Sequence, residues 1–210
     1  MLSENLFIGQ YMMRIINIER TLFIMRKLEE FVNEKLKITN NTPNYTHFPE
    51  TREELIEIIR EKIRTEGPDC DLNCIDVSRI DNFGGVFGSY GTKLFNGNIS
   101  KWDVSNAKSL NSMFNGSMYS GVDGGIANWD VSNVEMMDYM FNGSKFNSDI
   151  SDWNVEKVRS MVCAFQDCPF DQDITSWNPK SIEHHGFTKT FEYCPLKTNK
   201  RLPKWYKARL

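Results

Sequence analysis

The sequence predicts an α/β repeat solenoid with short parallel strands on one face, short helices on the other, and a helical cap at the N-terminal end. Two observations predict this fold. Tryptophans recur at intervals of 27, 24 and 24 residues, as Trp102, Trp129, Trp153 and Trp177, with similar neighbours each time. Apolar residues also return at fixed places around each tryptophan. A period of about 20 to 50 residues is typical of chains that stack identical units.

The repeat unit reads F-N-x-D-I-S-x-W-D-V-S-N-V-x-x-M-x-x-M-F. Its copies lie at residues 71–87, 95–114, 125–141, 146–165 and 170–191. The first copy has Ile75 in place of the tryptophan, and the last copy carries two extra residues. We therefore expect a five-rung solenoid over residues 70–195.

Aligning the copies gives four columns that stay apolar in every rung. The columns are Leu72, Ile99, Ile126, Ile150 and Ile174; Ile80, Ala107, Val134, Val158 and Ile182; Phe83, Leu110, Met137, Met161 and Phe187; and Phe87, Phe114, Phe141, Phe165 and Phe191. One unit cannot bury its apolar side alone, so stacking should merge these columns into one core.

The spacing within a copy predicts where strand and helix lie. In most copies the last three columns fall at i, i+3 and i+7, which is one face of a short helix. Ser and Asn precede that run, for example Ser105 and Asn106, and both are favoured N-cap residues. The stretch N-x-D-I-S-x-W is typical of a half-buried strand. The helical side should be the wider one, because packed helices lie about 8–10 Å apart.

The N-terminal third should be helical. Residues 48–69 predict a capping helix, with apolar residues at helical spacing, a capping box at Thr51 and Glu54, and a stop at Gly67. Residues 1–47 form an N-terminal helical segment and linker, in which residues 18–38 are amphipathic. We expect this segment to pack on the rest of the chain or on a copy of itself. Met25 is an alternative natural start.

Residues 196–210 form a basic C-terminal cap or tail, with six Lys and Arg and no Asp or Glu. Trp205 and Tyr206 suit a cap over the last rung. Contact of this tail with anions, on a membrane or a nucleic acid, is the alternative that stays open.

Charge narrows the choice of partners. The chain carries a net charge of −3, but residues 67–195 hold 9 basic and 17 acidic side chains. This acidic body repels phosphate, so we expect no nucleic acid on the solenoid. The N-terminus lacks the pattern of a signal peptide or a membrane span, so we expect a cytoplasmic or virion-associated protein.

No cluster in the sequence predicts a catalytic, cofactor or metal site. The five cysteines are expected to be free thiols, including Cys168 and Cys194, which share a column on the side where rungs should be far apart. A metal site at His184 and His185 lacks paired-ligand spacing. A calcium ladder along the acidic column is interrupted at Gly125.

The candidate site is the polar strand face, where repeat proteins usually bind partners. Its candidate partner-binding residues are Asn98, Ser100, Asp149, Ser151, Asp173 and Thr175.

The unit FNxDISxWDVSNVxxMxxMF resembles the BspA-like leucine-rich repeat of bacterial surface proteins, which is also found in mycoplasma lipoproteins. The resemblance covers roughly Phe48 to Trp205. It implies a leucine-rich-repeat-like solenoid used for adhesion or protein binding, and it brings no catalytic residue. Many members are exported, and residues 1–24 lack the export signal that this would need.

We therefore expect a non-catalytic module that binds another macromolecule, most simply a protein, through its solenoid surface. The alternative is a structural or assembly subunit, of a virion or a surface array, that forms homo-oligomers through the N-terminal helices. An enzyme would need a polar cleft between those helices and the first rung.

Overall fold

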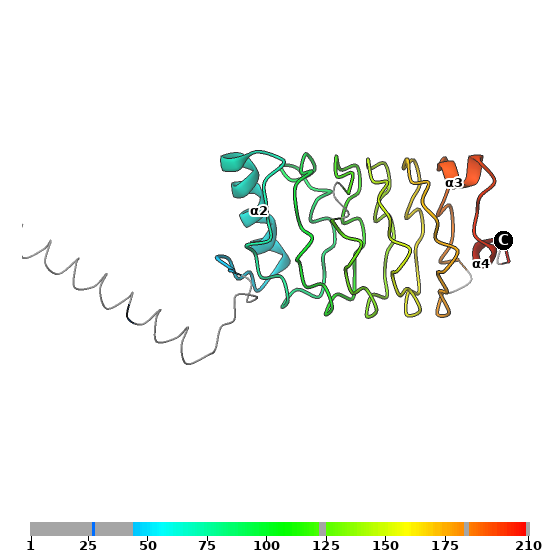
Figure 1. The fold of residues 1–210 in the computed structure, drawn as a ribbon, viewed down its shortest axis with the longest axis horizontal. Helices are drawn as coiled ribbons and strands as arrows, with labels where there is room; N and C mark the ends of the chain where they lie inside the picture. Colours follow the sequence, from blue (N-terminus) through cyan, green and yellow to red (C-terminus); the bar gives the residue numbers. More distant parts are fainter. Residues whose placement is uncertain (1–26, 28–43, 122–124, 183–184, 209–210) are drawn as a thin grey trace, which may run out of the picture. The chain divides into compact units, whose positions relative to one another are not determined.

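The structure, a computed structural model, describes residues 27, 44–121, 125–182 and 185–208. The chain divides into two compact units, Met1–Asn44 and Tyr45–Leu210, and the second contains all of the repeats. In this second unit a row of stacked rungs runs from helix α2 to the short helices α3 and α4 (Figure 1). The amphipathic segment predicted at residues 18–38 lies outside the described residues, apart from Lys27.

Helix α2 spans Arg52–Glu66, within residues 48–69 where the sequence predicted a helix. The Thr51 hydroxyl accepts a hydrogen bond from the backbone N–H of Glu54 at 3.2 Å, as the capping motif requires. The helix ends at Gly67, whose φ of 92° lies in the region that favours glycine. Its inner face is fully buried against the first rung through Leu55 and Ile59.

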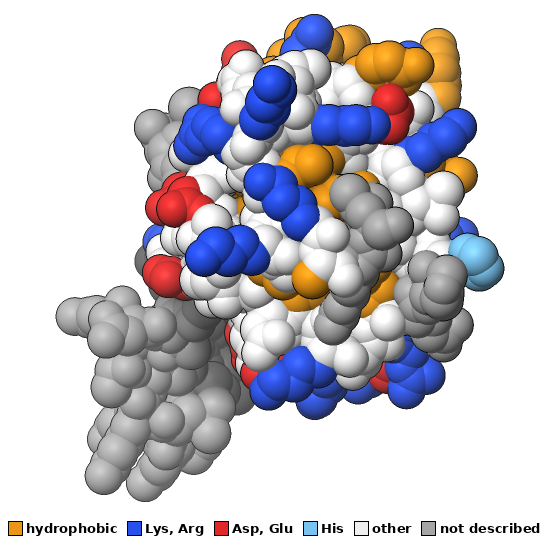
Figure 2. Space-filling view, turned by 90° about the vertical axis from the view of Figure 1, so that its right-hand side faces the viewer, with side chains coloured by type: hydrophobic (Ala, Val, Ile, Leu, Met, Phe, Trp, Pro, Cys, Tyr) orange, Lys and Arg blue, Asp and Glu red, His pale blue; other side chains and the backbone are white. Residues whose placement is uncertain are grey.

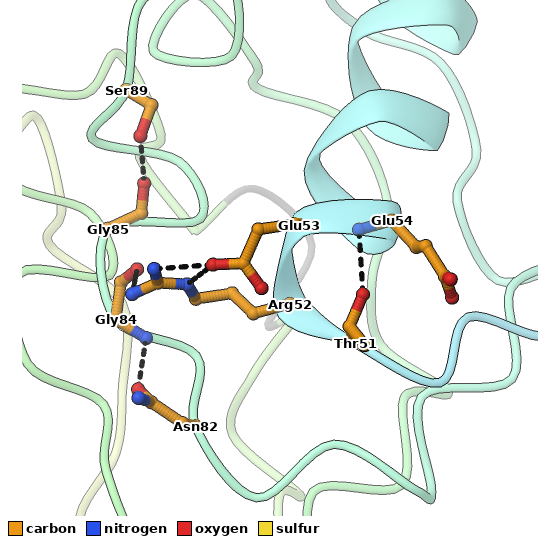
Figure 3. A network of polar contacts seen from close by, with 8 residues as sticks. All are labelled: Thr51, Arg52, Glu53, Glu54, Asn82, Gly84, Gly85 and Ser89. Atoms are coloured by element: carbon orange, nitrogen blue, oxygen red, sulfur yellow. Dashed lines mark hydrogen bonds and ion pairs between the residues drawn. The ribbon is translucent and has the colours of Figure 1, made fainter.

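Polar contacts fix the start of α2 against the first rung (Figure 3). The guanidinium of Arg52 donates to the carbonyl oxygen of Gly84 at 3.3 Å and pairs with Glu53 at 2.7 Å. Ahead of the helix, His47 forms a parallel bridge with Ile75 in the first rung. The helix and the segment before it therefore cover the N-terminal end of the repeat body together.

The predicted apolar columns are confirmed as one continuous core. All of their members are buried except Ile182, which is partly buried against the core. The phenylalanine column forms a stack with centroid distances of 5.2, 5.5, 5.4 and 5.5 Å between successive rungs. These spacings are close to the distance between neighbouring strands in a sheet. The described body is thus a repetitive, solenoid-like stack.

The short helices predicted in the rungs are wrong, because the described rungs contain turns at those places. In the third rung the N–H groups of Met137, Tyr139 and Phe141 donate to carbonyl oxygens of the next rung at 2.9, 2.8 and 2.8 Å. An α-helix would direct those N–H groups to carbonyls four residues earlier in the same rung. Main-chain bonds between rungs take the place of helix bonds.

Left-handed residues explain why no helix forms. One residue in each of four rungs has a positive φ although it is not glycine: Ser112 at 56°, Tyr139 at 57°, Cys163 at 54° and Lys189 at 55°. Gly85 occupies the same column in the first rung, with a φ of 68°. A residue in this conformation interrupts a right-handed helix, since the left-handed region is adopted one residue at a time. The apolar spacing of i, i+3 and i+7 is therefore produced by successive turns.

The predicted strand position is also corrected. Parallel bridges join Asn82 to Ser109, Ser109 to Met136, and Met136 to Ser160, within the segment assigned to the helix. In the stretch assigned to the strand, the described residues form one bridge between rungs, from Asp71 to Asn98, and Ile75 pairs with His47 from the segment ahead of α2. The narrow spacing of the phenylalanine stack likewise overturns the expectation of a wider helical side.

Tryptophan side chains hold the opposite side of the rungs together. The indole Nε1–H of Trp153 donates to the carbonyl oxygen of Ile126 at 3.0 Å, and that of Trp177 donates to Ile150 at 3.0 Å. The two indoles stack with centroids 6.3 Å apart. A buried Trp N–H needs such a partner, and here the partner always belongs to the preceding rung.

The described part of the basic tail packs against the last rung. Helix α3 spans Pro195–Thr198 and helix α4 spans Lys204–Lys207. Trp205 continues the tryptophan series, since it stacks on Trp177 at 6.3 Å and donates to the carbonyl oxygen of Ile174 at 3.0 Å. Tyr206 packs edge-on against Phe191 at 4.9 Å. The core is thus closed by aromatic side chains at its C-terminal end.

Candidate functional site

The six predicted partner-binding residues form pairs of one kind, which we call the Asx strip. In each pair the first side chain accepts a hydrogen bond from the backbone N–H two residues on. The distances are 3.0 Å for Asn98 and Ser100, 2.9 Å for Asp149 and Ser151, and 2.9 Å for Asp173 and Thr175. All six side chains are exposed except Ser151, which is half-buried. Each pair therefore fixes a turn and still reaches solvent.

The last two pairs of the strip line a shallow hollow of about 320 Å³. Its lining consists of Asp149, Ser151, Asp152, Gln172, Asp173, Thr175 and Ser176. The pair at Asn98 and Ser100 lies on the second rung and does not line this hollow. The structure thus brings four of the six predicted residues into one place.

Three residues of the hollow were missed from the sequence: Asp152, Gln172 and Ser176. Gln172 donates to the carbonyl oxygen of Asn147 at 3.2 Å, and the Ser176 hydroxyl donates to the carbonyl oxygen of Ser151 at 2.7 Å. Both contacts join the fifth rung to the fourth. The polar positions beside the predicted pairs were the signal that could have identified them.

The hollow is negatively charged. The pKa of Asp149 is lowered, chiefly because the carboxylate accepts the N–H of Ser151, and the neighbouring Asp173 opposes that shift. The pKa of Asp173 is lowered in the same way by Thr175. Both carboxylates are therefore ionised at neutral pH, and the hollow suits a partner that brings cations or hydrogen-bond donors.

A second, larger hollow of about 730 Å³ lies at the N-terminal end of the repeat body, and the sequence did not predict it. It is lined on one side by His47, Phe48 and Pro49 and on the other by residues of α2, including Ile56 and Ile58. Phe48 is 61% exposed. An exposed apolar surface of this kind is a feature of interaction sites.

The cysteines are free thiols, and four of the five are buried. All five are free, as predicted. Burial raises the pKa of Cys168 to about 11 and that of Cys194 to about 12, which disfavours the nucleophilic thiolate. Their thiols donate to the carbonyl oxygens of Phe146 and Phe170 at 3.1 and 3.0 Å. The expected reason for their being free, a wide gap between rungs, was wrong.

Two further observations concern chemistry within the described part of the chain. No group of three or more His, Cys, Asp or Glu side chains is placed to hold a metal ion there. His47 Nδ1 lies 4.0 Å from Cys74 Sγ and 2.8 Å from the hydroxyl of Thr46. Of the histidine pair considered as a metal site, His184 lies outside the described residues and His185 is exposed.

None of the described helices has the length and apolar character needed to cross a bilayer.

Comparison with known proteins gives one family. The sequence profile described as "Mycoplasma protein of unknown function, DUF285" matches residues 64–119 and 116–208. No curated protein and no solved structure matches the chain. The two matched segments together run from residue 64 to residue 208, which is more than half of the 210 residues and includes every rung. The chain therefore belongs to the DUF285 family of mycoplasma proteins.

Proposed function

We propose that this chain is a non-catalytic interaction module that binds a protein partner through the exposed surface of its rungs. One observation carries the proposal. The apolar columns of the rungs fill one core, while the Asx strip presents polar side chains in a repeated geometry outside it. Solenoids use extended surfaces of this kind for binding.

The chemistry of the strip favours a partner that is basic or rich in hydrogen-bond donors. The hollow at its end holds Asp149, Asp152 and Asp173. The carboxylates of Asp149 and Asp173 are already held by backbone N–H groups, so they lose little side-chain entropy on binding. The likeness of the repeat unit to the BspA-like leucine-rich repeat supports the same proposal, since that family is used for adhesion and protein binding.

The test is a binding experiment with variants that leave the fold intact. Ser100→Arg/Ser151→Arg/Thr175→Arg keeps every backbone N–H that the Asx turns need and places three long cations on the strip. The control, Thr65→Arg/Thr188→Arg, places two long cations at exposed threonines away from the strip. Each protein is immobilised and exposed to an extract of the cells that make the chain.

We expect the wild type and the control to retain a protein that the strip variant does not retain. After purification, that protein should bind the wild type in the absence of other proteins. Equal retention by the strip variant, or no retained protein at all, would contradict the proposal.

A second candidate function is a structural subunit that assembles through the N-terminal segment. The exposed apolar side chains of the N-terminal hollow, such as Phe48, favour association at that end. Light scattering on the full chain and on a chain starting at Met25 separates the two functions. Assembly of the full chain alone would support the structural role, and two monomers would leave the strip as the interaction surface.

A further inference from the structure

The C-terminal end of the repeat body has a surface unlike its sides. Figure 2 views this end and shows lysine and arginine side chains gathered around a small apolar centre. The described residues from 196 to 208 contribute five exposed cations and no acidic side chain: Lys197, Lys200, Arg201, Lys204 and Lys207. The preceding segment, residues 67–195, is acidic by eight charges, with 9 basic and 17 acidic side chains. Positive charge is thus concentrated on one end of an acidic body.

Three of the five cations are not used by the fold. Lys197 pairs with Glu192, and Arg201 pairs with Asp171 at 2.9 Å. Lys200, Lys204 and Lys207 form no ion pair with any described residue. Because no neighbouring carboxylate neutralises them, these three charges are available to a partner.

The cations sit on a rigid base. Helix α4 carries Lys204 and Lys207 on either side of Trp205 and Tyr206. Tyr206 is buried with its edge contact to Phe191, and the partly buried Trp205 stacks on Trp177. The lysines are therefore held at the end of the body and presented outward.

This arrangement favours one class of polyanion. Proteins that bind single-stranded nucleic acid need free aromatic faces on which bases can stack. Here the partly buried Trp205 indole is stacked on Trp177 and held by its hydrogen bond to Ile174, and Tyr206 is buried. A planar bilayer needs no such faces, because anionic headgroups attract clustered lysines by charge, and each lysine near the surface adds to the affinity. The acidic sides of the body stand away from a surface that meets only its end.

We propose that the C-terminal end of the repeat body docks on an anionic phospholipid surface through Lys200, Lys204 and Lys207. The inference does not rest on the proposed protein partner, which uses a different face. The contact is electrostatic and peripheral, since the aromatic rings of the cap are packed against the core.

The test is co-sedimentation of the full chain with vesicles. One set contains phosphatidylcholine and phosphatidylserine at about seven to three, and the other contains phosphatidylcholine alone. The test variant is Lys200→Gln/Lys204→Gln/Lys207→Gln. The control is Lys93→Gln/Lys108→Gln/Lys145→Gln, which removes the same charge from exposed lysines of the body that form no ion pair with described residues.

We expect the wild type and the control to bind the phosphatidylserine vesicles and not the neutral ones. Each lysine near the surface is worth roughly a fivefold change in affinity, so the test variant should bind about 100-fold more weakly. Wild-type binding should also weaken steeply between about 0.1 and 0.5 M salt, a readout that needs no variant. Matching thermal unfolding of the two variants excludes loss of the fold as the cause.

The proposal is overturned if the wild type does not bind phosphatidylserine vesicles or if the test variant binds them as tightly as the wild type. It is also overturned if salt does not weaken the binding of the wild type. A single-stranded oligonucleotide that binds the wild type, while the vesicles do not, would identify nucleic acid as the partner of this end instead.

Discussion

On one side of each rung main-chain groups join neighbouring rungs, whereas on the other side the tryptophan side chains bond to the preceding rung. The first side is represented by the N–H of Ser112, which donates to the carbonyl oxygen of Asp138 at 2.7 Å. The second is represented by Trp153, which reaches the carbonyl oxygen of Ile126 at 3.0 Å. The main-chain side depends on backbone conformation, and the tryptophan side depends on particular side chains.

This difference predicts where a side-chain substitution does the greatest damage. Replacing Trp153 with alanine should lower the free energy of unfolding by about 4 kcal/mol, because it opens a large cavity between two rungs. Replacing it with phenylalanine keeps an aromatic ring but leaves the Ile126 carbonyl without its donor, for a loss of about 1–3 kcal/mol. Urea unfolding measures both. If Trp153→Phe were as stable as the wild type, the indole hydrogen bond would not hold this side together.

A smaller effect is expected where the core carries a polar group without a described partner. The hydroxyl of Tyr119 is buried and makes no hydrogen bond with any described residue, while Phe95 and Phe146 fill the same column in the neighbouring rungs. Tyr119→Phe should therefore raise the free energy of unfolding by up to about 1 kcal/mol. The reciprocal control, Phe146→Tyr, should lower it. Destabilisation by Tyr119→Phe would show that the hydroxyl has a partner.

The smallest predicted effect is a pH dependence of the stability that the Asx turns contribute. The folded pKa of Asp130, Asp149 and Asp173 is lowered by the N–H groups and hydroxyls that these carboxylates accept from. Their stabilisation is complete above the unfolded pKa of about 3.9 and is lost as the pH falls through the lower folded pKa. Stability should therefore decrease as the pH drops below about 4.

The control for that prediction already exists in the chain, since Asn98 makes the same turn with an amide oxygen. The variant Asp130→Asn/Asp149→Asn/Asp173→Asn should keep the turns. In urea unfolding at a series of pH values, its free energy of unfolding should decrease less at low pH than that of the wild type. If the free energy of unfolding decreased equally in the variant and the wild type, other carboxylates would cause the decrease.

The apolar columns and the tryptophan ladder could be predicted because burial leaves a direct mark on composition. Phenylalanine recurs from Phe87 to Phe191 wherever the core needs it. The cap at Trp205 followed from the same logic, since an exposed last rung requires a cover. The family model matches residues 64–119 and 116–208, which include every rung that the sequence period indicated.

The helices were wrongly predicted for a specific reason. Turns that pass through the left-handed region at Ser112, Tyr139 and Lys189 produce the same apolar spacing as a helix. The left-handed region costs residues other than glycine about 1–2 kcal/mol, so such residues are not expected to adopt it. The identities of these residues therefore did not indicate the conformation. Gly85 was the one member of that column whose identity hinted at the conformation.

The candidate site shows the same limit. The Asx pairs lie within single copies and could be read from the sequence, whereas Asp152, Gln172 and Ser176 join the hollow only because two rungs are in register. The N-terminal hollow is lined by His47, which pairs with Ile75 of the first rung, and no local sequence pattern marks that pairing. The function of the Asx strip as a partner surface stays a prediction.

The main-chain side of the rungs can be tested directly by comparing glycine with alanine at Ser112 and at Lys189, where φ is 56° and 55°. If these residues lie in left-handed turns, each glycine variant should be more stable than its alanine counterpart by about 1 kcal/mol in urea unfolding. If the rungs contained helices instead, the order would reverse by a similar amount, because glycine destabilises a helix interior relative to alanine by about 1 kcal/mol. Greater stability of the glycine variants supports the main-chain ladder, and greater stability of the alanine variants contradicts it.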